Sequence, residues 1–190
     1  NSSCKYFLML NPDLLLNDDA IVQLVKGLER NSTLGFTTPK LYRANDELKK
    51  DSSLLDAAGM FLSSTWRHFD RGSQQLDGEQ YNKPELVFGG TGACLMLKRE
   101  CVEDLILTRS EHEADLFSLY PELLNGAEDR KQLLDEAFFA FREDAELAFR
   151  ANSYGWSCLY NPLAQGVHRR SVLPSNRANL SKMVNRLGVR

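Results

Sequence analysis

Residues 138–155 read FFAFREDAELAFRANSYG, and the organisation of the chain is best understood outward from this stretch. Phenylalanines lead into an acidic pair, Glu143 and Asp144, and apolar residues then recur at helical spacing until Gly155. The pattern predicts an aromatic segment followed by a helix with Asp144 in its first turn. The exposed amides and the dipole of that turn favour a negative charge. A carboxylate held there could accept a proton from a substrate hydroxyl, although acids are also common at helix starts without any catalytic role.

The composition of the 190 residues is typical of a single globular domain, with 43% hydrophobic and 26% charged residues. The formal net charge of −3 argues against a nucleic-acid partner. The four cysteines stand at unrelated spacings, which predicts buried free thiols in a reducing compartment rather than a disulfide or zinc framework. No apolar run is long enough to span a membrane and no signal peptide is recognisable, so we expect a cytoplasmic protein.

Polar residues follow two predicted strands. Residues 5–10 form a short apolar run, which predicts a strand buried on both faces, and a proline flanked by Asn11 and Asp13 ends it. Ligands bind at the carboxyl ends of strands in open α/β sheets, so Asn11 and Asp13 stand where a polar site is expected. A second predicted strand, over residues 156–160, also stops at an Asn-Pro pair and is followed by His168. A lone histidine, however, is more often structural than a ligand.

Other segments predict further elements of an α/β domain. These are a helix over residues 17–28 with Asn17 as its N-cap, a strand over 34–39 closed by proline, and a helix over 98–107. The aromatic and polar residues 66–84 predict a long loop, which either covers a ligand or extends into solvent without a binding role.

A glycine cluster lies in the stretch VFGGTGACLML over residues 87–97. Gly89, Gly90 and Gly92 permit a positive φ and the close approach of another backbone or of a ligand. The cluster is not a phosphate loop, because the Gly-Lys-Ser/Thr ending is missing and the glycines precede a strand. A tight bulge without any ligand is the alternative.

The order of these motifs resembles that of the family 2 glycosyltransferases, and most closely their rhamnosyltransferase-like branch. A strand ending in NPD is followed by DAAG, RG, FGGTGACLMLKRE, an aromatic run into ED, and GWSCLYNPLAQGVH. The resemblance covers most of residues 6–172, apart from an insertion at about 108–133. It implies the C-terminal portion of the A-type glycosyltransferase (nucleotide-diphospho-sugar transferase) fold, an α/β architecture with a mixed sheet flanked by helices. The family's preceding nucleotide-binding half has no counterpart in these residues, so we expect a fragment of a larger protein or a site completed by a partner.

The resemblance also implies roles for individual residues. Asp13 would bind a divalent metal, Mg²⁺ or Mn²⁺, that bridges the donor diphosphate, with His168 close to it. Asn11 would stand beside Asp13 on the donor side, at a partner position that often holds Asn in this branch, so metal binding would rest on fewer carboxylates. Asp144 would be the general base of an inverting transfer. The acceptor side would be lined by Gly90, Thr91 and Glu143.

These features divide the chain into a partial catalytic domain over residues 1–168 and a basic tail over 169–190. The tail contains six basic residues and no acid. Written as a helix from Ser175, it carries an apolar stripe beside basic residues, which suggests weak contact with an anionic membrane surface. A helix docked on its own domain, or on the missing half, is the alternative.

The expected function is transfer of a sugar, with rhamnose one candidate, from a nucleotide-sugar donor to a glycan or lipid-linked acceptor in polysaccharide biosynthesis. The reaction would take place in the cytoplasm, at the inner face of the membrane. A non-catalytic sugar-binding or scaffolding module that keeps the fold is the main alternative. A nucleotidyltransferase is a third reading, weakened by the absence of a basic glycine-rich phosphate loop.

Overall fold

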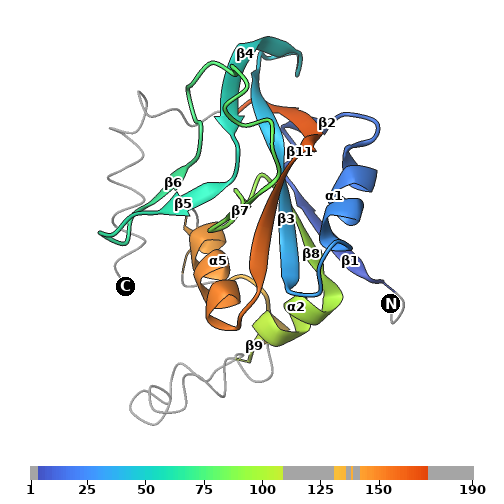
Figure 1. Cartoon of the computed structure of the whole chain (residues 1–190), viewed down its shortest axis with the longest axis vertical. Coiled ribbons are helices and arrows are strands. Elements are labelled where there is room, and N and C mark those ends of the chain that lie inside the picture. Colours follow the sequence, from blue (N-terminus) through green and yellow to red (C-terminus); the bar gives the residue numbers. More distant parts are fainter. Residues whose placement is uncertain (1–3, 109–130, 136–137, 139–141, 171–190) are drawn as a thin grey trace, which may run out of the picture.

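The computed structural model describes residues 4–108, 131–135, 138 and 142–170, and a mixed β-sheet with helices on both faces forms its centre (Figure 1). Along the sheet the strands follow the order β1-β8-β3-β11-β2, with β4 beside β3 and β7 beside β11. The pair β3–β11 is parallel, and the other pairs of this sheet are antiparallel. Its strands are β1 (Tyr6–Leu10), β2 (Leu14–Leu16), β3 (Leu34–Ala44), β4 (Lys50–Ala57), β7 (Glu85–Val87), β8 (Cys94–Lys98) and β11 (Ser157–His168).

Three helices and two small antiparallel pairs complete the described part of the chain. The helices are α1 (Ala20–Leu28), α2 (Arg99–Leu105) and α5 (Glu143–Ser153). The pairs are β5 (Met60–Leu62) with β6 (His68–Asp70), and β9 (Leu107–Thr108) with β10 (Lys131–Gln132). The mixed α/β class expected from the sequence is confirmed.

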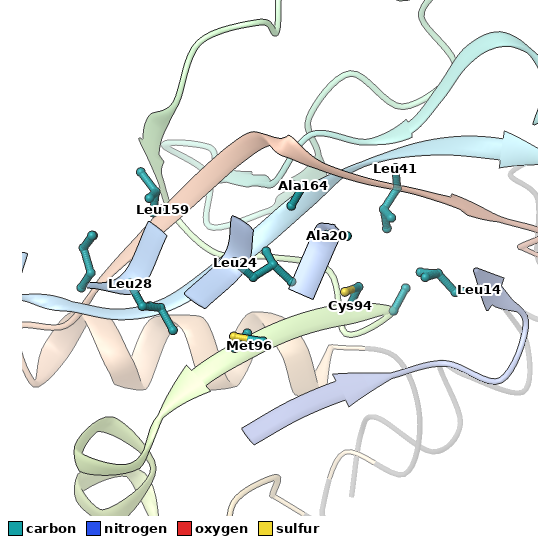
Figure 2. Packing of buried hydrophobic residues seen from close by; sticks show 11 residues of the cluster. Leu14, Ala20, Leu24, Leu28, Leu41, Cys94, Met96, Leu159 and Ala164 are labelled. Atoms are coloured by element: carbon teal, nitrogen blue, oxygen red, sulfur yellow. The ribbon is translucent and has the colours of Figure 1, made fainter. Parts of the chain in front are cut away.

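Each face of the sheet is buried by a different helix. Figure 2 shows Leu24 and Leu28 of α1 beside Met96 of β8 and Leu159 of β11, all members of one buried cluster. On the opposite face a second cluster joins α2 and α5 to the sheet. Its members include Phe36, Leu95, Leu97, Cys101, Leu105, Leu147, Ala148, Ala151 and Cys158.

Strand β8 shows why the sequence folds this way. Successive side chains of a strand point to opposite faces, so Cys94 and Met96 face α1 while Leu95 and Leu97 face α2 and α5. An uninterrupted apolar run is therefore needed at this strand, which helices cover on both sides. Burying each large apolar side chain here contributes about 1.5–3 kcal/mol.

The two longest strands correct the predicted strand ends, because both run through a proline. β3 continues past Pro39 to Ala44, and β11 continues past Pro162 to His168. Pro39 lies opposite Asn161, where the pairing of the two strands shifts register. On the other side of β3, pairing with β8 has ended and pairing with β4 has not begun. A proline without an N–H is tolerated at such an irregularity, whereas it would interrupt a regular ladder.

Two predictions near the N-terminus were wrong in detail. β1 was expected to be buried on both faces, but it pairs only with β8 among the described residues, and Phe7 and Leu10 are exposed. An apolar run does not by itself distinguish an edge strand from a central one. Helix α1 begins at Ala20 with Asp19 as an N-cap that makes no side-chain capping bond, so Asn17 is not the cap.

Part of the predicted loop over residues 66–84 is instead the β5–β6 hairpin. Phe61 and Phe69 stack across it with ring centroids 5.2 Å apart, and Trp66 lies against Phe149 of α5 at 5.7 Å.

The loop that follows the hairpin is fastened to the sheet by a buried ammonium group. Lys40 Nζ donates to Asp77 at 3.0 Å and to Asn82 at 2.7 Å, and the Tyr42 hydroxyl donates to Asp77 at 2.6 Å. These bonds satisfy a lysine that is only 1% exposed, which would otherwise be costly to bury.

The basic tail from residue 171, most of the insertion at 108–133 and residues 139–141 of the aromatic run lie outside the described residues. In the described part, no helix has both the length and the apolar character needed to cross a bilayer.

The cysteines provide a direct test of this burial pattern. Cys94, Cys101 and Cys158 are buried, whereas Cys4 is exposed, which corrects the expectation that all four are buried. Burial raises the pKa of the Cys94 and Cys101 thiols to about 12 and that of Cys158 well above its ordinary value.

At pH 8 we expect Ellman's reagent to modify one thiol quickly in the native chain and all four after unfolding. Cys4→Ser should abolish the fast reaction; a second fast thiol in the native chain would contradict the packing.

Candidate functional site

Two carboxylates flank the imidazole of His168, one at each ring nitrogen. Asp13 Oδ1 lies 3.3 Å from Nε2, and Asp56 Oδ2 lies 2.7 Å from Nδ1. His168 and Asp56 are buried, whereas the Asp13 side chain is 31% exposed. The imidazole is therefore almost fully enclosed, between a buried carboxylate and a partly exposed one.

The sheet brings these groups together from neighbouring strands. His168 ends β11, where it lies opposite Leu14 of β2 and Arg43 of β3. Asp13 directly precedes β2, and its carbonyl accepts the N–H of Arg169 at 3.0 Å. Asp56 comes from β4, the next strand beyond β3. The strand order β4, β3, β11, β2 thus presents Asp56, Arg43, His168 and Asp13 in sequence across one end of the sheet.

Two guanidinium groups surround the Asp56 carboxylate. Arg43 Nε lies 3.0 Å from Asp56 Oδ1, as an ion pair without the alignment of a hydrogen bond, and Arg170 Nη1 lies 3.4 Å from the same oxygen. Arg170 also pairs with Asp70 at 2.5 Å. The Arg43 side chain is only 7% exposed, and burial lowers its pKa. Each guanidinium group thus contacts a carboxylate, and this pairing offsets part of the cost of removing the charged groups from water.

Asp144 lies near this cluster, in the first turn of α5 as predicted. Its Oδ2 accepts the N–H of Gly92 at 3.0 Å, and its Oδ1 accepts the N–H of Ala145 at 2.8 Å. Burial raises the pKa of Asp70, against the effect of its pair with Arg170, and the nearby Asp144 carboxylate adds to the rise. Asp144 is therefore close enough to interact electrostatically with the carboxylate that Arg170 links to Asp56 and His168.

A second connection runs through the backbone. The N–H of Asn11 donates to the carbonyl of Ala93 at 2.9 Å, and the preceding residue, Gly92, donates its own N–H to Asp144. The segment that carries Asp13 and the helix that carries Asp144 are thus attached to the same turn before β8.

The end of α5 also follows the prediction. Gly155 has a φ of 86°, in the left-handed region, and the helix stops at Ser153. The N–H of Trp156 donates to Ala151 and that of Gly155 to Asn152, which satisfies the last carbonyls as in a Schellman motif.

The glycine cluster provides close approach rather than an unusual backbone conformation. A Cβ at Gly89 would lie 2.5 Å from the Cβ of Ala148, and a Cβ at Gly90 would lie 2.5 Å from that of Thr38. Neither residue has a positive φ. The absence of a side chain at Gly89 lets α5 pack directly on the turn before β8, and its absence at Gly90 lets the same turn pack on β3. Asp144 accepts the N–H of Gly92 in this turn.

The structure brings Asp13 and His168 into contact, whereas Asp144 is connected to Asp13 only through the turn before β8, and the other predicted site residues contribute differently. The Asn11 side chain is exposed, and only its backbone takes part. Thr91 is 8% exposed and lies in the turn beside Gly92, and Glu143 is partly buried at the start of α5.

Sequence reasoning did not assign roles to Asp56, Arg43, Asp70 or Arg170. Only Asp56 had a visible signal: it is an acid inside the apolar run LLDAAGMFL, where a charge needs partners. The other three become recognisable through the strand register and the Asp70–Arg170 ion pair.

The donor atoms suit a divalent cation that shares its coordination with a bound ligand. Asp13 Oδ1 and His168 Nε2 face each other at 3.3 Å; the carboxylate oxygen suits Mg²⁺ or Mn²⁺, whereas an imidazole nitrogen is a more usual ligand of the later transition metals. Within the described ranges, no three His, Cys, Asp or Glu side chains are arranged as a complete metal-binding set. Mg²⁺ commonly uses one or two carboxylates together with phosphate oxygens and waters, so a two-residue site fits that mode.

No protein-family model matches the chain, and the search of curated proteins gives no significant match.

The packing of the glycine turn yields a paired stability test. Gly90→Ala introduces a methyl group 2.5 Å from Thr38, whereas a methyl group at Gly92 lies 3.5 Å from the Asp144 Cβ, an ordinary contact. We expect Gly90→Ala to lower the free energy of unfolding by about 1–3 kcal/mol, as overpacking does. Gly92→Ala should remain within about 0.5 kcal/mol of the parent. Urea denaturation of both variants measures the difference, and equal losses would show that the turn is not packed as described.

Proposed function

We propose that the chain belongs to an inverting glycosyltransferase of the A-type fold, which moves a sugar from a nucleotide-sugar donor to a hydroxyl of a glycan or lipid-linked acceptor. The observation that supports this most is that Asp144, a carboxylate fixed by two backbone N–H groups, is bound to the same turn before β8 as the segment carrying Asp13, which contacts His168. An inverting transfer needs a base on the acceptor side and a phosphate-binding group on the donor side. The same end of the sheet offers candidates for both.

Asp144 is the proposed general base. Hydrogen bonds from Gly92 and Ala145 fix both of its oxygens in orientation. As the acceptor oxygen forms its bond to the anomeric carbon, the Asp144 carboxylate takes the proton of that hydroxyl. The bond from the anomeric carbon to the diphosphate breaks, and its electron pair leaves with the nucleoside diphosphate. A positioned base of this kind contributes about 10²–10⁴-fold to the rate.

Asp13 and His168 are the proposed ligands of Mg²⁺ or Mn²⁺. A divalent cation, when bound, offsets the negative charge of the departing diphosphate. The local charge favours a cation, because three carboxylates stand against two guanidinium groups around His168: Asp13, Asp56 and Asp70 against Arg43 and Arg170. His168 contributes a buried nitrogen whose position is fixed by Asp56.

The acceptor and the place of reaction follow from the resemblance to rhamnosyltransferase-like enzymes. Rhamnose is the first donor sugar to test, and polysaccharide biosynthesis is the expected process. Lipid-linked acceptors would be met in the cytoplasm at the inner face of the membrane. Gly90, Thr91 and Glu143 lie on the Asp144 side of the network and are the proposed acceptor contacts.

A non-catalytic sugar-binding or scaffolding module would not need a base, so Asp144 separates the two functions. In the full-length protein, we expect Asp144→Asn to lower kcat by about 10²–10⁴-fold, because the amide cannot accept the proton. Donor binding should be retained, since the change conserves shape. Asp19→Asn, at the start of α1 on the opposite face of the sheet, is a matched control that should leave kcat unchanged. Equal kcat values for Asp144→Asn and the parent would exclude Asp144 as the base.

The donor side is tested by metal-dependent binding. Calorimetric titration of the full-length protein with a nucleoside diphosphate should show tighter binding in Mn²⁺ than in EDTA. Asp13→Asn removes one charged ligand, so we expect it to weaken the Mn²⁺-dependent binding by roughly tenfold, or about 1.4 kcal/mol. Binding in EDTA should not change. If Mn²⁺ has no effect on binding by the parent, the metal role of Asp13 and His168 is wrong.

A further inference from the structure

We propose that Asp56 is a positioning residue that holds His168 in the tautomer protonated at Nδ1, so that the Nε2 lone pair is directed at a divalent cation beside Asp13. The role of that cation rests on the proposed function. The tautomer itself is a property of the side chains and can be measured without any transfer reaction.

The first step of the argument is the direction of the hydrogen bond at Nδ1. Asp56 Oδ2 lies 2.7 Å from this nitrogen, and the Asp56 side chain is only 1% exposed. Two guanidinium groups flank the other oxygen of the carboxylate, at 3.0 Å and 3.4 Å, which suits a negative charge there. A carboxylate can only accept, so the proton of this bond belongs to Nδ1.

The second step concerns the opposite nitrogen. When Nδ1 carries the proton of a neutral imidazole, Nε2 carries a lone pair, and this lone pair faces Asp13 Oδ1 at 3.3 Å. Two acceptors then face each other with no hydrogen between them. A divalent cation bound to both atoms removes that repulsion. A histidine that binds a metal with one nitrogen and donates the other N–H to a carboxylate is the usual arrangement in metal sites.

The third step is that the surroundings hold Asp56 in place. It lies in β4 between two fully buried residues, Leu55 and Ala57, which pair with Tyr42 and Leu41 of β3, and its Oδ1 lies 3.0 Å from Arg43 Nε. Arg43 and Arg170 approach the same Asp56 oxygen from β3 and from the residues after β11. The carboxylate cannot turn away from Nδ1 without leaving the buried Arg43 and the partly buried Arg170, so the ring orientation of His168 is fixed by the fold.

The test uses the nitrogen chemical shifts of the histidine rings. The chain has three histidines, so ¹⁵N-detected spectra of labelled protein contain few signals, and His168→Gln identifies the one from His168. In Mg²⁺ at pH 8 we expect the Nδ1–H tautomer for the native chain. In Asp56→Asn the amide can donate to Nδ1, so the proton should move to Nε2. A ring in the native chain with its proton on Nε2, or on both nitrogens, would overturn the proposal, as would an unchanged tautomer in Asp56→Asn.

Metal affinity provides the second readout. Loss of a residue that orients a metal-binding histidine typically weakens binding by about 10–100-fold, and we expect this loss of Mn²⁺ affinity for Asp56→Asn by electron paramagnetic resonance. Asp77→Asn is the matched control, because Asp77 is also a partly buried carboxylate paired with a cation, Lys40, but it does not contact His168. It should leave both the tautomer and the Mn²⁺ affinity unchanged. Equal Mn²⁺ affinities for Asp56→Asn and the parent would count against the positioning role.

Asp56→Asn leaves the buried Arg43 without its ion-pair partner and could prevent folding. In that case Arg43→Met together with Asp56→Asn removes the unpaired charge and permits the same measurements. The tautomer of the native chain tests the proposal even without a variant. A full-length protein that shows the expected tautomer change but no sugar transfer would refute the proposed function while supporting the role of Asp56. Sugar transfer by the full-length protein, together with an unchanged His168 tautomer in Asp56→Asn, would support the proposed function and refute the role of Asp56.

Discussion

The parallel pairing of β3 with β11 is the constraint on which the rest of the structure depends. It joins residues 34–43 to residues 157–168, far apart in the chain, and every other strand of the main sheet except β1 pairs with one of these two. Such non-local pairing is costly in chain entropy, and the apolar clusters that α1, α2 and α5 form on the two faces offset that cost. The register of this pair also sets His168 against Arg43. The core and the charged network are therefore determined by one alignment.

The charged network has features that packing alone would not favour. Arg43 is buried beside Asp56, yet among the described residues its two terminal nitrogens have no hydrogen-bond partner. Replacing a buried ion pair by apolar residues of similar size is often neutral or stabilising, so stability does not explain why the ions are present. Departures of this kind from good packing are expected at functional sites. The concentration of carboxylates and guanidinium groups at one end of the sheet, with Asp56 and Arg43 buried, fits that expectation.

Sequence reasoning predicted the parts of the site that depend on local structure. Asp13 follows a strand and Asp144 lies at the start of a helix, and turn residues and hydrophobic periodicity predict both positions. Asp56 and His168 meet only because β4 and β11 lie on either side of β3, which is information about strand order that one sequence does not contain. The predicted strand ends at Pro39 and Pro162 were wrong for a related reason. Pro39 and Pro162 end a strand only when the neighbouring ladder is regular, and here the register shift between β3 and β11 accommodates them.

Arg170 joins the two halves of the network, and its backbone shows what that position requires. Its φ of 31° lies in the left-handed region, which is unfavourable for a residue with a side chain. The conformation directs the guanidinium to Asp56 on one side and to Asp70 on the other. Asp56 belongs to the His168 side, whereas Asp70 ends the β5–β6 hairpin and interacts electrostatically with Asp144. A glycine would adopt this backbone at less cost but could not make either ion pair. The left-handed backbone at Arg170 therefore accompanies a side chain that bridges Asp56, the partner of His168, and Asp70 of the hairpin.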